Sequence, residues 1–268
     1  MPVFYDQLQR TVYLPSTPKR IISVVPSQTE LLFYLGLNEQ IVGITKFCIH
    51  PADKFKLTKK VGGTKQLDIA KIKTLSADLI IANKEENDQG QIEELMDCCP
   101  VWISDISDLE GALDMIERVG ALVGKSDEAK VLASQISQQF NNTAIEPSNL
   151  RVAYFIWRKP YMVAGKDTFI DSMLQKCGLV NAFEQSRYPE IDEKTLINAN
   201  PDVIFLSSEP YPFKEKHIAE FKNILPSALI KVVDGELFSW YGSRLLYAPA
   251  YFKKLTNECT SVKSSTNR

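Results

Sequence analysis

The sequence predicts an α/β protein made of two Rossmann-like lobes, joined by a long helix, with a ligand cleft between the lobes. Three observations predict it. Short β-branched runs alternate with helix-like segments in both halves of the 268-residue chain, a stretch without any strand-length run separates the halves, and "SADLIIAN" is echoed by "NPDVIFLS". We therefore expect an N-terminal lobe over residues 1–106, a linking helix over 107–142 and a C-terminal lobe over 143–268.

The first half shows strand and helix in turn after about twenty residues without a regular pattern. Its expected strands are short and apolar, which is typical of strands buried between helices. They span residues 20–25, 41–46, 78–83 and 100–104. Helical spacing of apolar residues is found at 27–36, 69–75 and 91–97.

The linking segment has apolar residues at helical spacing throughout. Asp108 and Ser126 are N-cap candidates, and Gly124 lies where a break between two helices would fall. The segment is therefore one long helix or two abutting ones. Beyond it, we expect strands at 151–157, 161–165, 201–208 and 231–235, and helices at 168–178, 214–224 and 245–255.

Charge and hydropathy exclude two classes of partner. Lys and Arg number 31 against 33 Asp and Glu, a net charge of −2, so we expect no nucleic-acid binding. No run reaches the roughly 18 apolar residues of a membrane span, and the N-terminus has no secretory apolar core. We expect a cytoplasmic monomer; a periplasmic or cell-surface location is the alternative, should a leader have been removed.

The cysteines and histidines do not form a recognisable metal or disulfide pattern. Five cysteines, two of them adjacent at Cys98 and Cys99, suit a reducing compartment better than a disulfide framework. Two histidines and no CxxC or HExxH leave too few ligands for structural zinc. The sequence "VGGTK" lacks P-loop spacing, so Gly62 and Gly63 are expected to form a tight turn with positive φ.

The pair Cys48 and His50 in "TKFCIHPADK" allows three interpretations: contact with a metal or metal chelate, activation of a nucleophile, or loop packing. In the second half, Trp157, Tyr161, Trp240 and Tyr241 follow or interrupt strand ends, where side chains face a cleft. We expect these rings to contact a large flat ligand, although at least one should be an ordinary core residue. Arg244 follows in the same cluster, "FSWYGSR".

Polar segments follow buried strands at matching places in the two halves. Asn83 and Lys84 begin the run at 82–91, and residues 207–217 occupy the equivalent place in the second half. Side chains at such strand ends line clefts, although a solvated loop explains the composition equally well. The mirrored placement favours a cleft.

The segments "RIISVVPSQTELLFYLGLNEQIVGIT", "VGGTKQLDIAKIKTLSADLIIAN" and "INANPDVIF" resemble the helical-backbone (class III) substrate-binding proteins of ABC importers, in their cobalamin, iron-siderophore and heme-binding branch. The resemblance spans residues 19 to 256. It implies a rigid two-lobed receptor that closes only modestly. It places the Cys48 and His50 segment, Lys65 with Gln66, Trp157, and Trp240 with Tyr241 on cleft loops.

Receptors of this family carry one glutamate on each lobe that meets the permease, and here the matching positions are Ala70 and Lys194. Asp68, Asp192 and Glu193 lie close by. The substitutions argue against docking to an ABC permease.

The sequence thus predicts a non-enzymatic binding protein without an intrinsic cofactor, for a corrinoid first and for heme or a ferric siderophore next. Arg244 would pair with a ligand carboxylate or phosphate, and Cys48 or His50 would contact the metal, with His50 as axial ligand. One alternative is a cytosolic enzyme or metallochaperone with Cys48 as thiolate donor. Another is an interaction module whose cleft is filled by its own side chains.

Overall fold

Residues 3–266 are described by the computed structural model, with side chains up to residue 262. The chain divides into two compact units. The first contains the described residues up to Ile106, together with Glu110–Ile136 and Tyr241–Arg244; the second contains Ser107–Leu109, Ser137–Trp240 and the chain from Leu245. Each unit is built on its own sheet, parallel in the first unit and mixed in the second, so the α/β prediction is confirmed.

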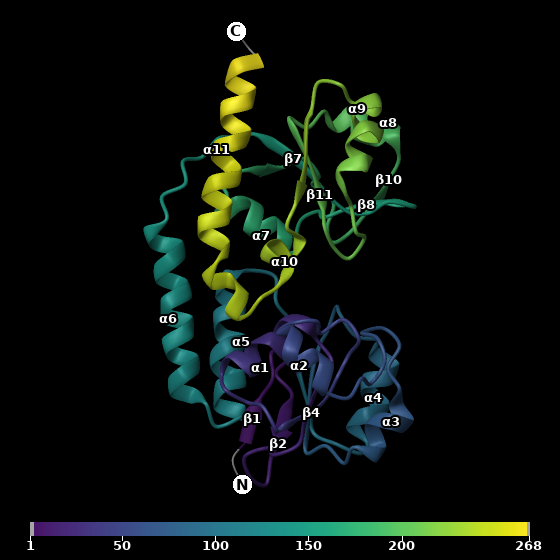
Figure 1. The fold of residues 1–268 in the computed structure, drawn as a ribbon, viewed down its shortest axis with the longest axis vertical. Helices are drawn as coiled ribbons and strands as arrows, with labels where there is room; N and C mark the ends of the chain where they lie inside the picture. The colour runs from purple at the N-terminus through teal and green to yellow at the C-terminus, as the bar shows by residue number, and fades with distance from the viewer. Residues whose placement is uncertain (1–2, 267–268) are drawn as a thin grey trace. The chain divides into compact units, whose positions relative to one another are not determined.

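The sheet of the first unit has four parallel strands in the order β4-β3-β5-β6. They are β3 (Ile21–Ser23), β4 (Ile41–Ile44), β5 (Leu79–Asn83) and β6 (Val101–Ser104). Four helices connect them: α1 (Pro26–Tyr34), α2 (Ala52–Leu57), α3 (Ile69–Thr74) and α4 (Gln89–Met96) (Figure 1). Nearly every strand residue is buried, which explains why the sequence shows apolar runs instead of alternation.

The N-terminal segment is a hairpin, so the expectation of an irregular start is wrong. Strands β1 (Val3–Tyr5) and β2 (Thr11–Tyr13) pair antiparallel. Their turn is closed by the buried carboxylate of Asp6, which accepts hydrogen bonds from the backbone N–H groups of Leu8 and Arg10. Strands of three residues are too short to show the alternation that a sequence reading needs.

The linking segment forms two helices, α5 (Leu109–Leu122) and α6 (Ser126–Asn142). Gly124 adopts φ +71° between them, a left-handed conformation that suits glycine. The helices pack closely because Gly120 has no side chain: a Cβ there would lie 2.2 Å from the Cβ of Ala129. Of the two alternatives that the sequence left open, the structure has the pair of abutting helices.

The sheet of the second unit combines parallel and antiparallel strands. Its parallel part comprises β7 (Arg151–Trp157), β11 (Val203–Ser207), β12 (Leu229–Val233) and, beside β7, β9 (Val180–Asn181). The strands β8 (Tyr161–Val163) and β10 (Glu190–Ile191) extend it antiparallel. The helices are α7 (Phe169–Lys176), α8 (Glu193–Ala199), η1 (Glu215–His217), α9 (Ile218–Ile224), α10 (Gly235–Ser239) and α11 (Ala248–Thr266), with η2 at Ser243–Leu246.

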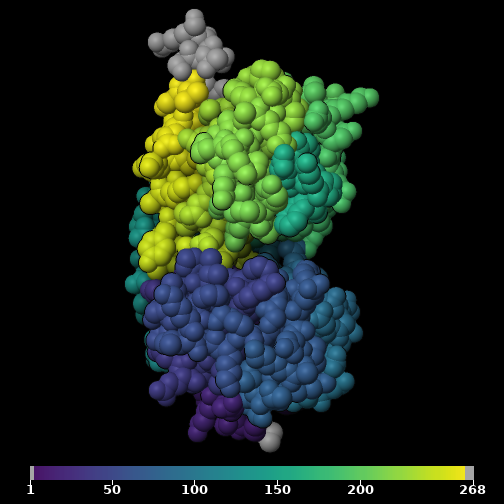
Figure 2. Space-filling view, turned by 45° about the vertical axis from the view of Figure 1, so that its right-hand side comes forward, coloured from purple at the N-terminus to yellow at the C-terminus, as the bar shows by residue number. Residues whose placement is uncertain are grey.

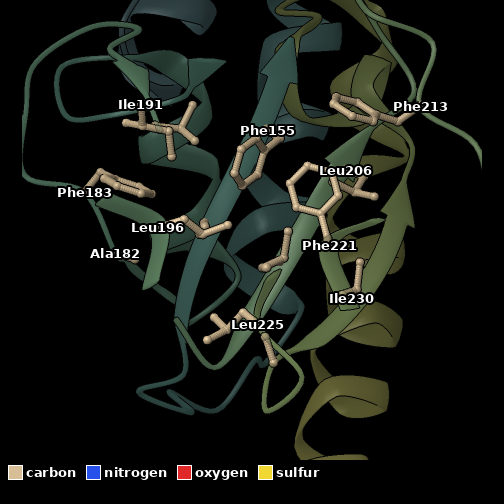
Figure 3. Close-up of a cluster of buried hydrophobic side chains, with 14 residues drawn as sticks. Phe155, Ala182, Phe183, Ile191, Leu196, Leu206, Phe213, Phe221, Leu225 and Ile230 are labelled. Atoms are coloured by element: carbon tan, nitrogen blue, oxygen red, sulfur yellow. The ribbon is translucent and has the colours of Figure 1, made fainter. Parts of the chain in front are cut away.

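One face of this sheet is covered by a cluster of buried apolar side chains. Phe155 and Leu206 project from the central strands toward Phe221 of α9 (Figure 3). The ring centroids of Phe155 and Phe221 are 4.7 Å apart. This cluster fixes α9, and with it the segment that leads from β11 to α9.

The last helix, α11, runs beyond residue 255, where the sequence analysis expected it to end. Its later turns remain anchored because Cys259 is buried and Thr256 donates a hydrogen bond to the carbonyl of Cys177. The outer face of α11 forms part of the surface of the second unit (Figure 2, yellow). Within residues 3–266, no helix combines the length and apolar character needed to cross a membrane.

Candidate functional site

The loops after β3, β4 and β5 meet at the carboxyl edge of the first sheet. The strand order β4-β3-β5-β6 places a topological switch point there, because the connections from β3 and β4 lead to opposite sides of β3. Ligands of open α/β sheets bind outside the carboxyl ends of strands at such points. The first unit therefore offers a candidate binding edge.

Asn87 ties three of these loops together. Its side-chain oxygen accepts a hydrogen bond from the backbone N–H of Asn83, and its Nδ2 donates to the carbonyls of Val24 and Thr64, each at 3.1 Å. Neither the loop after β3 nor the turn at 62–67 could shift without breaking one of these bonds. The edge is thus held in place by a buried amide.

Asn83, a predicted ligand contact, is buried and used structurally. Its Oδ1 accepts from the backbone N–H groups of Glu85 and Glu86, and its Nδ2 donates to Ser104. Lys84 is exposed and forms an ion pair with Asp105 at 2.6 Å. Asn83 therefore stabilises the backbone of the loop after β5, and Lys84 lies at the surface of that loop.

Cys48 lies in the interior with no exposed surface, which favours the packing interpretation. Its Sγ is 3.1 Å from the hydroxyl oxygens of both Thr29 and Thr45. Burial raises the pKa of the thiol, although the threonine hydrogen bonds oppose this. As placed, Cys48 packs in the interior of the first unit.

His50, two residues further on, is half-buried in the loop that leads to α2. No group of three or more His, Cys, Asp or Glu side chains in the described part of the chain could hold a metal ion. A metal carried by a chelate needs fewer protein ligands than a bare ion, so His50 stays a candidate for axial contact.

Phe47 is the exposed ring of this loop, and the sequence analysis overlooked it. Its side chain is 51 % exposed, and the Nζ of Lys46 lies 5.1 Å from its centroid. Lys65 and Gln66 are exposed on the neighbouring turn, and the Nζ of Lys65 donates to the carbonyls of Glu85 and Asn87. That turn has the positive φ predicted for it, at Gly62 (φ +103°).

Glu86 adds a titratable group to this edge. Burial raises the pKa of its carboxyl group, and the ammonium of Lys65 acts in the opposite direction.

The second unit exposes Trp157 at the carboxyl end of β7. The indole is 40 % exposed, and its edge packs against Tyr211 at a centroid distance of 5.8 Å. Its Nε1 donates to the carbonyl of Lys159. Tyr211 belongs to the segment 207–217 that the sequence analysis matched to the first-half loop, although it was not singled out there.

Tyr161 is part of a charged network beside this ring pair. Its hydroxyl donates to Glu220 Oε1 at 2.5 Å, and the guanidinium of Arg158 pairs with the same carboxylate at 2.7 Å. Burial and this hydrogen bond raise the pKa of Tyr161. Burial also acts to raise the pKa of Glu220, but the bonds from Arg158 and Tyr161 outweigh it and lower the pKa.

Trp240 and Tyr241 are each only 6 % exposed, so these two rings are not the open stacking surface that the sequence analysis expected. The Nε1 of Trp240 donates to Glu209 Oε1 at 2.8 Å. The sequence analysis expected at least one of the four aromatic residues to be a core residue, and the burial of Trp240 and Tyr241 agrees with that.

Arg244, predicted to pair with a ligand acid, instead forms a bidentate pair with Glu30 of α1, at 2.7 and 3.0 Å. Glu30 had not been singled out, because a lone carboxylate on an amphipathic helix carries no signal of its partner.

The two helices at the positions of the family's docking glutamates begin with aspartate caps. Asp68 accepts from the backbone N–H of Lys71 at the start of α3, and Asp192 accepts from that of Thr195 at the start of α8. This hydrogen bonding lowers the pKa of Asp192. Asp68 and Asp192 thus serve as N-caps of these helices, and Glu193 lies in the first turn of α8.

Two surface hollows are also present, and the second includes Thr195 of α8. One is lined by residues 10–13 and 96–101, at the amino end of β6, and the other by residues 182–185, 195, 198 and 199. Neither contains a side chain that the sequence analysis selected.

The chain is similar in sequence and in fold to known proteins. The family described as periplasmic binding protein matches residues 21–226. A vitamin B12-binding protein of Pectobacterium carotovorum is 23 % identical over 239 residues, which is 86 % of each chain. An uncharacterised ABC transporter substrate-binding lipoprotein of Bacillus subtilis, YvrC, is 25 % identical over 211 residues, covering 74 % of this chain and 67 % of its own. The periplasmic heme-binding protein BhuT, solved with two hemes, superimposes with a TM-score of 0.80 at 23 % identity, over 90 % of this chain and 99 % of its own.

Proposed function

Since the chain belongs to the periplasmic binding protein family, we propose that it is a non-enzymatic binding protein for a bulky metal chelate. A corrinoid is the first candidate, and heme or a ferric siderophore is the next. The observation that carries this proposal is the exposed ring that follows the carboxyl end of a parallel strand in each unit, Phe47 after β4 and Trp157 at the end of β7. Exposed rings at such strand ends suit contact with a large flat ligand.

The order of candidates follows from the relatives. Vitamin B12-binding proteins recur among the similar sequences and extend over most of their length, whereas the heme-binding likeness is one of fold. The exposed aromatic surfaces themselves accept a corrin or a porphyrin equally.

The kinship with an ABC transporter lipoprotein supports delivery of the chelate to a permease. We propose that any such contact differs from that of the family's glutamates, because α3 and α8 present Ala70 and Lys194 at those positions and their nearby aspartates cap the helices. The alternative of a cytosolic enzyme or metallochaperone loses its thiolate donor, since Cys48 is buried with a raised pKa.

The test is titration of the purified protein with cyanocobalamin, hemin and a ferric hydroxamate chelate, followed by tryptophan fluorescence and calorimetry. We expect one of the three to bind. Because a stacked ring contributes about 1.5–3 kcal/mol of burial, Trp157→Ala and Phe47→Ala should each weaken binding by about tenfold or more.

Tyr13→Ala is the control, because Tyr13 is an exposed ring, 61 % against 51 % for Phe47, but belongs to β2 and the hollow at the amino end of β6. It should leave affinity unchanged. Failure of all three chelates to bind would overturn the proposed function, and equal losses in all three variants would remove the aromatic edges from it.

A further inference from the structure

Helix α2 presents a surface that the proposed function does not use. We call it the α2 surface: the exposed side chains of Lys46, Lys56, Leu57 and Lys59, together with the half-buried Lys54. None of the residues of α2 itself is buried. Leu57 is 82 % exposed, the highest value of any large apolar side chain described in the structure. A helix without a single fully buried side chain gains little from packing within its own unit.

The segment 46–60 is positively charged, whereas the whole chain has a net negative charge. Residues 46–60 contain five lysines and a single aspartate, in a protein whose net charge is −2. Among the described residues, Lys46, Lys54, Lys56 and Lys59 take part in no ion pair. These four ammonium groups are therefore available to an external anion.

Two further lysines, Lys60 and Lys71, add positive charge near the α2 surface. The Nζ of Lys60 donates to the carbonyls of Phe55 and Thr58 and lies 4.1 Å from the centroid of the Phe55 ring. These contacts stabilise the carboxyl end of α2. Burial lowers the pKa of Lys60, Cys48 acts in the opposite direction, and the positive charge of Lys71 acts with burial. Asp53 and Asp68 are the acidic groups on these elements.

We propose that the α2 surface docks on a bilayer of anionic phospholipid. Lysines around one protruding apolar side chain match such a surface: the ammonium groups reach the lipid phosphates while Leu57 enters the boundary of the acyl chains. Clusters of four or more lysines bind anionic membranes, each strengthening adsorption about fivefold. An acidic protein would satisfy the charges but would leave Leu57 without an apolar environment unless it also carried a matching pocket.

The test is flotation of the full-length protein with vesicles of phosphatidylcholine alone, and of phosphatidylcholine mixed with phosphatidylglycerol. The protein should float with the mixed vesicles only, and added salt should release it. The double variant Lys54→Glu and Lys56→Glu should lose at least about tenfold in partitioning. Leu57→Ser should lose a smaller factor while keeping the salt dependence.

The control is Lys253→Glu with Lys254→Glu on the exposed face of α11, which makes the same change in net charge in the second unit. It should float like the wild type. Absence of binding to the mixed vesicles, or an equal loss in the control, would overturn the proposal. Because neither Leu57 nor any of the four substituted lysines belongs to the candidate ligand edges, chelate titration of the same variants separates this result from the proposed function.

Discussion

The loops at the carboxyl edges of the two parallel sheets are held in different ways. In the first unit, buried amides and hydroxyls bind the loop backbones directly, with Asn87 joined to Asn83, Val24 and Thr64. In the second unit, rings pack on one another and a half-exposed ion pair closes the network, with Tyr161 and Arg158 both bound to Glu220. The first edge therefore depends on buried polar groups, whose loss lowers the free energy of unfolding strongly. The second depends on contacts that water can partly replace.

The largest effect is expected at the first edge. Asn87→Ala should lower the free energy of unfolding by roughly 2–4 kcal/mol, because it leaves buried backbone groups without their partner. Urea unfolding followed by circular dichroism measures this. Asn198→Ala, an exposed asparagine on α8, should change it by less than about 0.5 kcal/mol. Similar effects at the two positions would show that the amide does not hold the loops.

A second comparison separates the two residues that the sequence placed together on one loop. His50→Ala should abolish the absorbance shift that accompanies corrinoid or heme binding, because a half-buried imidazole on an exposed loop can serve as an axial ligand. Cys48→Ala should leave the shift and the affinity unchanged, because the thiol is enclosed between Thr29 and Thr45. A shift that survives His50→Ala would remove His50 from the site, and one lost with Cys48→Ala would contradict the packing role.

The smallest effect belongs to the second edge. Glu220→Gln should lower the free energy of unfolding by about 0.5–1 kcal/mol at neutral pH, since the pair is half-exposed. The folded-state pKa of Glu220 lies below its ordinary value, so its contribution is complete above the ordinary glutamate range and is lost as the pH falls through the lowered value.

The difference between wild type and Glu220→Gln should therefore shrink on acidification, as measured by urea unfolding across that range. Glu117→Gln, on the exposed side of α5, is the control and should show no such dependence. A difference that grows toward acid pH would mean that Arg158 and Tyr161 do not favour the ionised carboxylate.

The α/β architecture of each unit follows from local sequence patterns. The parallel strands β3, β5, β7 and β11 were predicted because strands covered on both faces are apolar at most positions, which leaves a short continuous apolar run. Short elements such as β1, β2, α2 and β10 were missed because two to six residues hold too few positions to show a period.

Which side chains are exposed at the candidate edges depends on contacts between segments that are distant in the chain. Cys48, Phe47 and His50 are near neighbours in one loop, yet the first is enclosed by Thr29 and Thr45 and the second is half in solvent. Likewise, Arg244 is engaged by Glu30, 214 residues away in the chain. Burial and ion pairing depend on partners that are distant in sequence, whereas strand and helix patterns depend on residues that are close in sequence.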